Sequence, residues 1–466
     1  MAVTARPQVV VVGAGPAGIR AAEALASAGL VPLVIDEGER AGGQIYRRPP
    51  DALSRPPAVL YGSEAGKAVA LHATFDRLVA QGRARHWPRC AVLAVAERSL
   101  QVLGPEGVST VRFDRLVLAT GATDRLAPVQ GWDSPGVYSL GAMQVALKAQ
   151  AVALGRRIVL AGSGPLLTLV ATQLLAAGAR LEAVLDTASL ADQLRGLPDL
   201  MTRPSLTVRG LAMRARLARL YRPGVRLGAI ETDARGPVAV TWHDAWGRPR
   251  RSPCDAVGLG WHLRAETQLA ELAGCAFDFD ETWRQWLPRG DAMGRGAEGV
   301  YLAGDGFRLR GADGAELSGR LAGAACLEDL GLPVQRTAAD LAALSRVSRF
   351  AQGIARAFPW PRDMVRQTPD GTVVCRCEGV TAGMVRAAAA HGGADVNRAK
   401  SLGRVGMGRC QGRYCQIAGA EIVAAAAGHA SPAQAGRLRG QAPVRPAPVA
   451  AIAGPAAAVD PLQGDR

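Results

Sequence analysis

The stretch that decides the fold is Val9-Val10-Val11-Val12-Gly13-Ala14-Gly15-Pro16-Ala17-Gly18. Four β-branched residues run directly into a glycine-rich loop, and alanine-rich, helix-forming sequence continues to residue 28. Gly13 permits a tight turn, Gly15 lets backbone approach a pyrophosphate, and Gly18 lets the helix pack closely on the strand. The first N–H groups of the helix and its dipole favour a phosphate there. The stretch therefore predicts the phosphate-binding loop of a dinucleotide site.

An acidic residue follows in the order that such a site requires. A second strand is expected over positions 31–35, and Asp36 comes directly after it. A carboxylate in this place accepts a hydrogen bond from a ribose hydroxyl. A glycine pair shortly afterwards lets backbone come close to a flat ligand, although a flexible loop is the alternative. The further candidate residues for an adenine dinucleotide here are Glu37, Gly42, Gly43 and Gln44.

Two later strands end in small-residue turns. Positions 115–122 lead into Thr120-Gly121, which is similar to the turn where the first domain of flavoprotein reductases ends. Positions 299–306 lead into Gly304-Asp305. In flavoproteins of this type that strand returns to the first domain and its aspartate binds the ribitol chain of FAD. A helix is expected to begin near Ala315 and to point its N-terminus at the flavin. The alternative role for Asp305 is to cap that helix.

A second copy of the strand–loop–helix–strand unit begins at Arg157. Its loop is Gly162-Ser163-Gly164-Pro165-Leu166-Leu167, and its second strand ends on Asp186. The spacing from Gly162 to Asp186 nearly equals that from Gly13 to Asp36, so one supersecondary unit occurs twice. Leu167 stands where the third glycine belongs, so the unit is expected to hold NAD(H) or another nucleotide poorly, or not at all. If it is occupied, Asp186 favours NAD over NADP.

Four of the eight cysteines form two close pairs near the C-terminus. The first pair is Cys375-Arg376-Cys377, and the second, further along the chain, is Cys410-Gln411-Gly412-Arg413-Tyr414-Cys415. Thiolates in this number can hold a [2Fe–2S] cluster. Zinc is an alternative, although structural zinc sites usually have wider pairs, and disulfides are disfavoured in a reducing compartment. The spacing favours the cluster. The remaining cysteines are expected to be buried small hydrophobes: Cys90, Cys254, Cys275 and Cys326.

Composition narrows the partners and the compartment. The 466 residues carry a formal net charge of +15, but only three lysines, and the arginines form no dense stripe. Few aromatic residues are present to stack bases, so nucleic-acid binding is not expected. No stretch reaches the roughly 18 apolar residues of a membrane span, and the N-terminus does not look like a signal peptide. A cytoplasmic location is expected, with peripheral association with the inner membrane also allowed.

The predicted fold class is α/β: a two-dinucleotide-binding, Rossmann-like flavoprotein with a small helical C-terminal [2Fe–2S] domain. An FAD-binding domain is expected over residues 1–129 and 290–332, with an NAD-binding-like domain inserted at 130–289. A helical linker over 333–372 and a cysteine domain over 373–430 follow. The last segment, 431–466, holds Pro, Ala, Gly and Arg without a period and is expected to be an extended arm with a disordered end.

The cysteine segment, from Val374 to Glu378 and from Gly406 to Cys415, resembles the [2Fe–2S] domain of bacterioferritin-associated ferredoxin. Its fusion to a two-dinucleotide flavoprotein resembles the larger subunits of opine oxidase, hydrogen cyanide synthase and D-hydroxyproline dehydrogenase. Further segments are similar to that family, at positions 42–46, 131–137, 161–167 and 442–446. The resemblance covers nearly the whole chain, and it makes the leucine in the second loop a family feature.

This resemblance implies a hetero-oligomer. A smaller FAD-dependent subunit of the amino-acid oxidase type would oxidise a C–N bond, and a small ferredoxin-like subunit is allowed as well. The present chain would pass the electrons through FAD and the cluster to an acceptor such as the quinone pool, with no catalytic side chain of its own. FMN at a subunit interface is a further cofactor that the resemblance allows.

Two alternatives stay open on the sequence: a self-sufficient NADH-dependent reductase, and a nucleotide-binding scaffold subunit. His86, His243 and His262 stand without a readable catalytic triad and are expected to be core or solvated residues.

Overall fold

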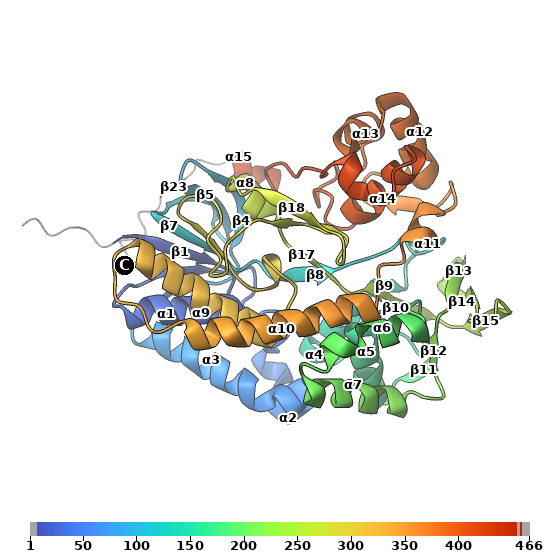
Figure 1. The fold of residues 1–466 in the computed structure, drawn as a ribbon, viewed down its shortest axis with the longest axis horizontal. Helices are drawn as coiled ribbons and strands as arrows, with labels where there is room; N and C mark the ends of the chain where they lie inside the picture. Colours follow the sequence, from blue (N-terminus) through green and yellow to red (C-terminus); the bar gives the residue numbers. More distant parts are fainter. Residues whose placement is uncertain (1–6, 454–456, 459–466) are drawn as a thin grey trace, which may run out of the picture.

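The computed structural model describes residues 7–453 and 457–458. Two five-stranded parallel sheets, each covered by helices, lie side by side, and a small helical lobe stands apart at one end (Figure 1, red). The last residues of the expected C-terminal arm, 454–456 and 459–466, lie outside the described residues. In the described part of the chain, no helix has the length and apolar content needed to cross a membrane.

The first sheet holds the fold-deciding stretch at its centre. Its strands run in the order β20 (Val300–Leu302), β7 (Arg115–Leu118), β1 (Val9–Val12), β2 (Leu33–Ile35) and β3 (Arg85–Trp87). Every neighbouring pair is parallel. Strand β1 is fully buried, which explains its unbroken run of valines. Strand β20 completes this sheet although the whole second sheet lies between β7 and β20 in the chain.

Helices of small residues cover the first sheet. Helix α1 (Pro16–Ser27) packs on α9 (Gly311–Asp329). A Cβ atom at Gly319 would lie 2.1 Å from the carbonyl oxygen of Ala17, so the contact requires glycine. Helix α9 begins at Gly311 rather than near Ala315 as expected, because the Asp305 carboxylate accepts hydrogen bonds from the first N–H groups of this segment. Helices α2 (Pro57–Tyr61) and α3 (Ala65–Ala80) lie nearby.

The second sheet repeats the parallel arrangement. Its order is β12 (Tyr221–Pro223), β11 (Arg180–Asp186), β10 (Arg157–Ser163), β16 (Ala256–Trp261) and β9 (Val137–Ser139). Its helices are α4 (Leu140–Ala149), α5 (Pro165–Ala176), α6 (Leu190–Leu200) and α7 (Pro204–Arg216). Leu167 is fully buried among leucines and valines of this layer. The residue that breaks the glycine pattern is thus part of a hydrophobic core.

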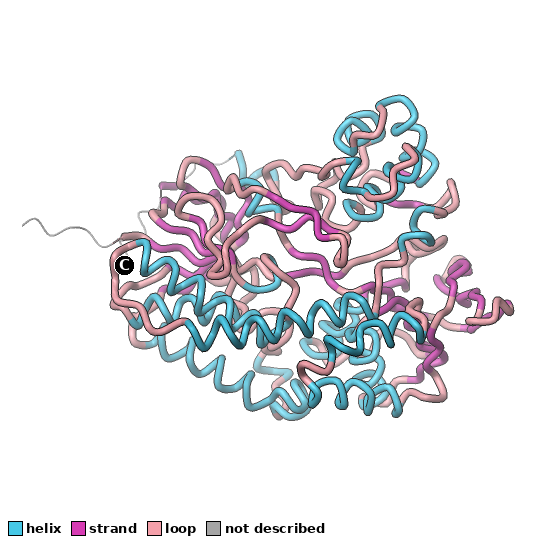
Figure 2. The backbone as a smooth tube through the Cα atoms, in the orientation of Figure 1, coloured by secondary structure: helices cyan, strands magenta, loops and turns pink. Residues whose placement is uncertain are grey.

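The chain also forms smaller sheets, and Figure 2 draws all strands in magenta. One contains β4 (Ala91–Ala96), β5 (Ser99–Gly104), β6 (Gly107–Arg112) and β23 (Ala457–Ala458). A second contains β13 (Arg226–Asp233), β14 (Gly236–His243) and β15 (Pro249–Pro253). Three two-stranded sheets pair β8 (Ala122–Asp124) with β17 (Leu263–Ala265), β18 (Phe277–Asp280) with β19 (Gln285–Pro288), and β21 (Val373–Cys375) with β22 (Val380–Thr381). The short helix α8 (Gln268–Leu272) follows β17.

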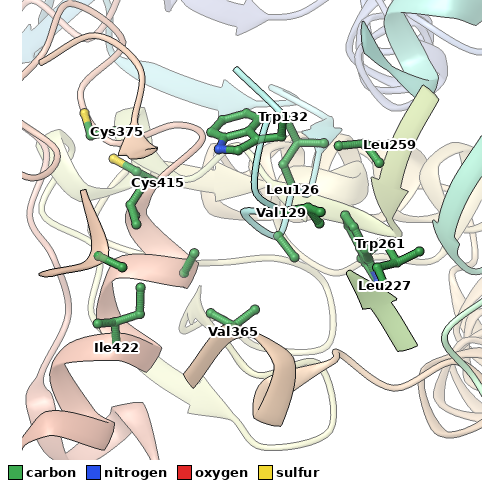
Figure 3. Packing of buried hydrophobic residues seen from close by; sticks show 14 of the residues in the cluster. Leu126, Val129, Trp132, Leu227, Leu259, Trp261, Val365, Cys375, Cys415 and Ile422 are labelled. Atoms are coloured by element: carbon green, nitrogen blue, oxygen red, sulfur yellow. The ribbon is translucent and has the colours of Figure 1, made fainter. Parts of the chain in front are cut away.

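A long helix leads to the C-terminal lobe. Helix α10 (Ala338–Ala357) packs along α6 and α9. The helices after it are α11 (Arg362–Arg366), α12 (Ala382–Gly392), α13 (Val396–Gly403), α14 (Gln416–Ala426) and α15 (Val449–Ala453). Trp132 joins the lobe to the second sheet, because its indole N–H donates to Val373 O at 2.6 Å. Figure 3 shows Trp132 in one apolar cluster with Cys375 and Cys415.

Candidate functional site

A cavity of about 720 Å³ opens at the carboxyl ends of the strands of the first sheet, where ligands of open α/β sheets bind. We call it the first cavity. Ten of the residues predicted to bind a dinucleotide line it: Gly13, Gly15, Asp36, Glu37, Gly43, Gln44, Thr120, Gly121, Gly304 and Asp305. The structure therefore brings together candidates from four separate strand ends.

Glycines shape the wall of this cavity by allowing backbone to meet backbone. A Cβ atom at Gly13 would lie 2.3 Å from Ala119 O, and one at Gly18 would lie 1.7 Å from Gly13 O. The glycine pair after β2 packs on the same loop: Gly42 N–H donates to Ala14 O at 2.8 Å, and a Cβ at Gly43 would lie 2.9 Å from the Cα of Gly15. Gly18 and Gly42 thus shape the loop behind the wall, because they are not among its lining residues.

Asp36 binds the loop directly. Its carboxylate accepts hydrogen bonds from Ala14 N at 2.5 Å and from Gly38 N at 2.6 Å. Burial raises the pKa of Asp36, and these two N–H groups oppose that rise. The side chain therefore holds the first glycine loop against the end of β2 while it also lines the cavity.

Asp305 lies at the start of α9 and at the wall of the first cavity. Its carboxylate accepts hydrogen bonds from Arg310 N at 2.7 Å and Gly311 N at 3.0 Å, which are donors at the start of α9. Desolvation raises the pKa of Asp305. The same residue lines the first cavity, together with Gly311, Ala312 and Ala315 of that helix. The beginning of α9 therefore faces the cavity, and Asp305 fixes its position.

The second glycine loop has a different environment. A Cβ at Gly162 would lie 1.8 Å from Gly260 O, which places that glycine against β16. A Cβ at Gly164 would lie 2.9 Å from the imidazole ring of His262. The His262 ring thus lies on the loop at the position where a pyrophosphate would approach. His262 Nε2 is 2.8 Å from Phe358 O, and burial lowers the pKa of His262 to about 4.

The acidic residue of the second unit is sequestered. Asp186 is fully buried, and its carboxylate accepts hydrogen bonds from Ser163 Oγ and Ala188 N, each at 2.8 Å, and from the Tyr221 hydroxyl. All of these partners belong to the second sheet or its loops. The carboxylate that was expected to bind the ribose of a nicotinamide nucleotide is therefore already hydrogen-bonded to protein groups.

The four cysteines of the C-terminal lobe form two contacting pairs. The Cys375 thiol is hydrogen-bonded to Cys415, and backbone N–H groups of Gly406, Glu378 and Cys377 also help lower the pKa of Cys375 to about 6. The Cys377 thiol is hydrogen-bonded to Cys410, but burial raises the pKa of Cys377. All eight cysteines, which lie in the described part of the chain, are free thiols. Within residues 7–453 and 457–458, no set of three or more His, Cys, Asp or Glu has the geometry to hold a metal ion.

The loop between Cys410 and Cys415 reaches the first cavity. Arg413 lines that cavity, and its Nε lies 3.1 Å from Oε2 of the buried Glu266. Arg264 Nη1 donates to Arg413 O at 2.7 Å. Gln268 Nε2 donates to Gln411 O at 2.7 Å. The lobe is therefore anchored to the cavity wall by charged and polar contacts. Sequence reasoning missed Glu266, because an isolated glutamate after an unremarkable strand carries no motif.

The C-terminal segment adds a further residue to the same wall. Arg445 lines the first cavity and forms ion pairs with Glu37 and, at 3.3 Å, with Glu266. Glu37, predicted as a ligand for the dinucleotide, is thus shared with a residue from the end of the chain.

Comparisons with known proteins agree with this architecture. The family model "Pyridine nucleotide-disulphide oxidoreductase" matches residues 7–204. The model "Sarcosine oxidase A3 domain" matches residues 371–455, which include the four paired cysteines. Among solved structures, L-proline dehydrogenase from P. horikoshii is similar in fold, with a TM-score of 0.69 at 19% identity, over 96% of this chain and 79% of that chain. The predicted α/β fold class is thereby confirmed.

Relatives of higher sequence identity extend over most of the chain. The A-type subunit of opine oxidase from Agrobacterium tumefaciens (strain Ach5) is 36% identical over 461 residues, which cover 95% of this chain and 90% of that protein. The hydrogen cyanide synthase subunit HcnB of Pseudomonas protegens is 32% identical over 424 residues, covering 87% of this chain and 89% of that protein.

Proposed function

Because the chain belongs to the family of the opine oxidase A-type subunits and is an FAD-dependent oxidoreductase, we propose that it is the electron-transferring subunit of a hetero-oligomeric amino-acid or imino-acid dehydrogenase. A smaller FAD-dependent subunit of the amino-acid oxidase type would oxidise the C–N bond of an opine, hydroxyproline, proline or glycine. The present chain would relay the electrons to an acceptor such as a quinone. The relatives named as subunits of opine oxidase and hydrogen cyanide synthase support a role within a larger assembly.

The first cavity is the proposed FAD site. Its glycine loop would receive the pyrophosphate, Asp36 and Glu37 would lie near the adenosine ribose, and Asp305 with the start of α9 would lie near the flavin end. FAD, when bound there, supplies two-electron chemistry that can also proceed in single-electron steps. The chain itself binds and orients this group.

The paired cysteines are the proposed [2Fe–2S] site. A [2Fe–2S] cluster binds two thiolates at each iron, and two contacting pairs, Cys375 with Cys415 and Cys377 with Cys410, are consistent with that division. The N–H groups around Cys375 favour a thiolate. Gly408 packs directly against Cys377, because a Cβ at Gly408 would lie 2.1 Å from the Cys377 Cβ. A site for one metal ion, such as zinc, would instead require all four sulfurs around a single centre.

One observation carries the proposal: Arg413, inside the second cysteine pair, lines the first cavity and binds Glu266 in its wall. A cluster on these cysteines would therefore lie beside a flavin in the cavity, which suits the exchange of electrons between a two-electron and a one-electron carrier.

The test is the iron content and the visible spectrum of the chain purified anaerobically, with and without its partner subunit. We expect flavin absorbance and about two irons per chain. Cys410→Ser should lose most of the iron and keep the bound nucleotide, whereas the matched control Cys254→Ser, at a buried cysteine of the second domain, should keep both. Unchanged iron in Cys410→Ser would contradict the cluster assignment. Absence of both flavin and iron from wild type would refute the function.

A further inference from the structure

A second cavity of about 790 Å³ lies between α5, α6, α7 and α10. Its wall is mainly apolar, with side chains such as Leu166, Leu194, Leu211, Phe350, Ile354 and Phe358. Leu190 and Leu194 at its edge are 61% and 66% exposed. This edge of the cavity therefore presents apolar side chains to solvent.

The second cavity meets the first. Leu263, Asp305 and Gly311 line both of them. Asp305 and Gly311 mark the start of α9, where we place the flavin end of the proposed FAD site. A ligand in the second cavity would therefore lie next to the group that stores electrons in the proposed function.

The second cavity lies at the second glycine loop, through Pro165 and Leu166, yet it does not suit a nicotinamide nucleotide. Asp186 is bound within the protein, and His262 lies on Gly164. The loop thus retains its backbone course but lacks free groups for a ribose and a pyrophosphate.

The other polar side chains in this wall are mostly engaged with protein partners. Arg214 donates to Gln193 Oε1 and the Tyr221 hydroxyl, and Arg209 pairs with Glu64 at 2.7 Å. Thr207 donates to Leu200 O at 2.7 Å. These side chains are therefore poorly available for the two negative charges of a dinucleotide.

Arg310 is the exception. Its Nη1 is buried and has no hydrogen-bond partner among the described residues, and the residue lines the second cavity. Burial lowers the pKa of Arg310 to about 10, so the guanidinium is still a cation at neutral pH. A buried, unpartnered donor is unfavourable unless a ligand supplies an acceptor. Because most of the lining residues are apolar, the fitting acceptor is a carbonyl oxygen on an apolar molecule.

We propose that the second cavity binds a quinone rather than NAD(H), and that the quinone accepts electrons there. The ring would lie near Asp305 with one carbonyl oxygen on Arg310, and the aliphatic chain would leave between α6 and α7. This inference rests on the proposed function, since it needs a reduced flavin as donor. The step would move two electrons and two protons from reduced flavin to quinone, giving oxidised flavin and quinol. No further reactant is required.

The experiment measures binding of decylubiquinone to the purified, flavin-loaded chain, by its melting midpoint and by quenching of tryptophan fluorescence. Gly210 of α7 lines the cavity, and a Cβ there would meet no atom of the described residues within 4 Å. Gly210→Phe should therefore fill the space without a backbone clash and weaken quinone binding at least tenfold. The matched control is Gly66→Phe in α3, where an added Cβ would likewise meet no atom within 4 Å in the described part of the chain. This variant should bind quinone as wild type does.

Arg310→Met should weaken quinone binding severalfold, and Arg310→Lys should restore part of it, because the donor is replaced. NADH should not raise the melting midpoint of any variant. Equal quinone binding by wild type and Gly210→Phe would overturn the proposal, as would NADH binding that Gly210→Phe abolishes. Binding does not require the cluster, so this inference and the cysteine assignment can fail independently.

Discussion

Arg413 Nε lies 3.1 Å from Oε2 of Glu266, and this ion pair joins the cysteine lobe to the wall of the first cavity. Glu266 is buried and also pairs with Arg264 at 3.2 Å and Arg445 at 3.3 Å. One carboxylate thus connects β17, the cysteine loop and the C-terminal segment. It acts together with the hydrogen bonds that Arg264 and Gln268 donate to the cysteine loop.

Glu266→Gln should destabilise the chain, because three arginines would then surround a neutral group. Breaking a buried ion pair from one side costs about 3–5 kcal/mol, and chemical denaturation measures it. Glu231→Gln is the control, since Glu231 pairs with an exposed Arg251, and its effect should stay below about 1 kcal/mol. Equal effects of the two substitutions would show that Glu266 does not organise this junction.

Arg445→Ala should loosen the dinucleotide in the first cavity. Removal of this guanidinium leaves Glu37 and Glu266 without one of their cations, and their charge then repels a pyrophosphate. We expect about tenfold weaker retention, equal to about 1.4 kcal/mol, measured as nucleotide remaining after dialysis. The control Arg439→Ala removes a more exposed arginine that pairs with Glu271. If Arg445→Ala retains as much nucleotide as Arg439→Ala, this role for Arg445 is wrong.

His262 should make stability depend on pH in the acidic range. Its pKa is lowered from 6.5 to about 4 by burial, so the unfolded chain takes up the proton first. Neutral His262 therefore contributes on the order of 3 kcal/mol to the free energy of unfolding. This contribution is complete above about pH 6.5 and is lost as the pH falls toward 4. His262→Gln, whose amide can still donate to Phe358 O, should flatten this part of the profile of unfolding free energy against pH. If the unfolding free energy of wild type and of His262→Gln varies with pH in the same way, this role of His262 is wrong.

NADH alone should leave the flavin oxidised. Asp186 and Gly164 are both blocked within the protein, so the second unit lacks a place for the nucleotide. Anaerobic stopped-flow spectra with NADH test this, and the positive control adds substrate together with the partner subunit. Leu167→Gly restores the glycine pattern and should still give no reduction, because Asp186 remains buried. Rapid bleaching of wild type by NADH would instead favour the self-sufficient reductase.

The first glycine loop could be predicted from the sequence, because its backbone geometry requires glycine at particular positions. A side chain at Gly13 or Gly18 would clash with a carbonyl oxygen. The need for glycine at these positions is therefore visible in the local sequence. Strand β20 could be placed for a similar reason: a buried run ending in a small turn repeats the pattern of β7. The start of α9 was expected about one turn too late, because a carboxylate outside the helix binds its first N–H groups.

The remaining features depend on contacts between distant segments. His262 reaches Gly164 from a strand end far along the chain, and no local pattern in a single sequence predicts that contact. The loop alone therefore left the second unit open between an occupied and an empty site. Arg445 and Glu37 are even more remote from each other, with a sequence separation of 408 residues. Only the folded topology shows that the C-terminal segment contributes to a wall whose glycines are at the N-terminus.

That contribution has a consequence for the order of events during synthesis. Val444 N–H donates to Leu93 O at 2.9 Å, and Arg445 pairs with Glu37. At about 5–20 residues per second, the ribosome needs roughly 20 to 80 seconds to reach Arg445 after it has made Glu37. Throughout that interval the first cavity lacks Arg445, one of its lining residues. The nascent chain can therefore enclose its nucleotide only after translation is nearly finished.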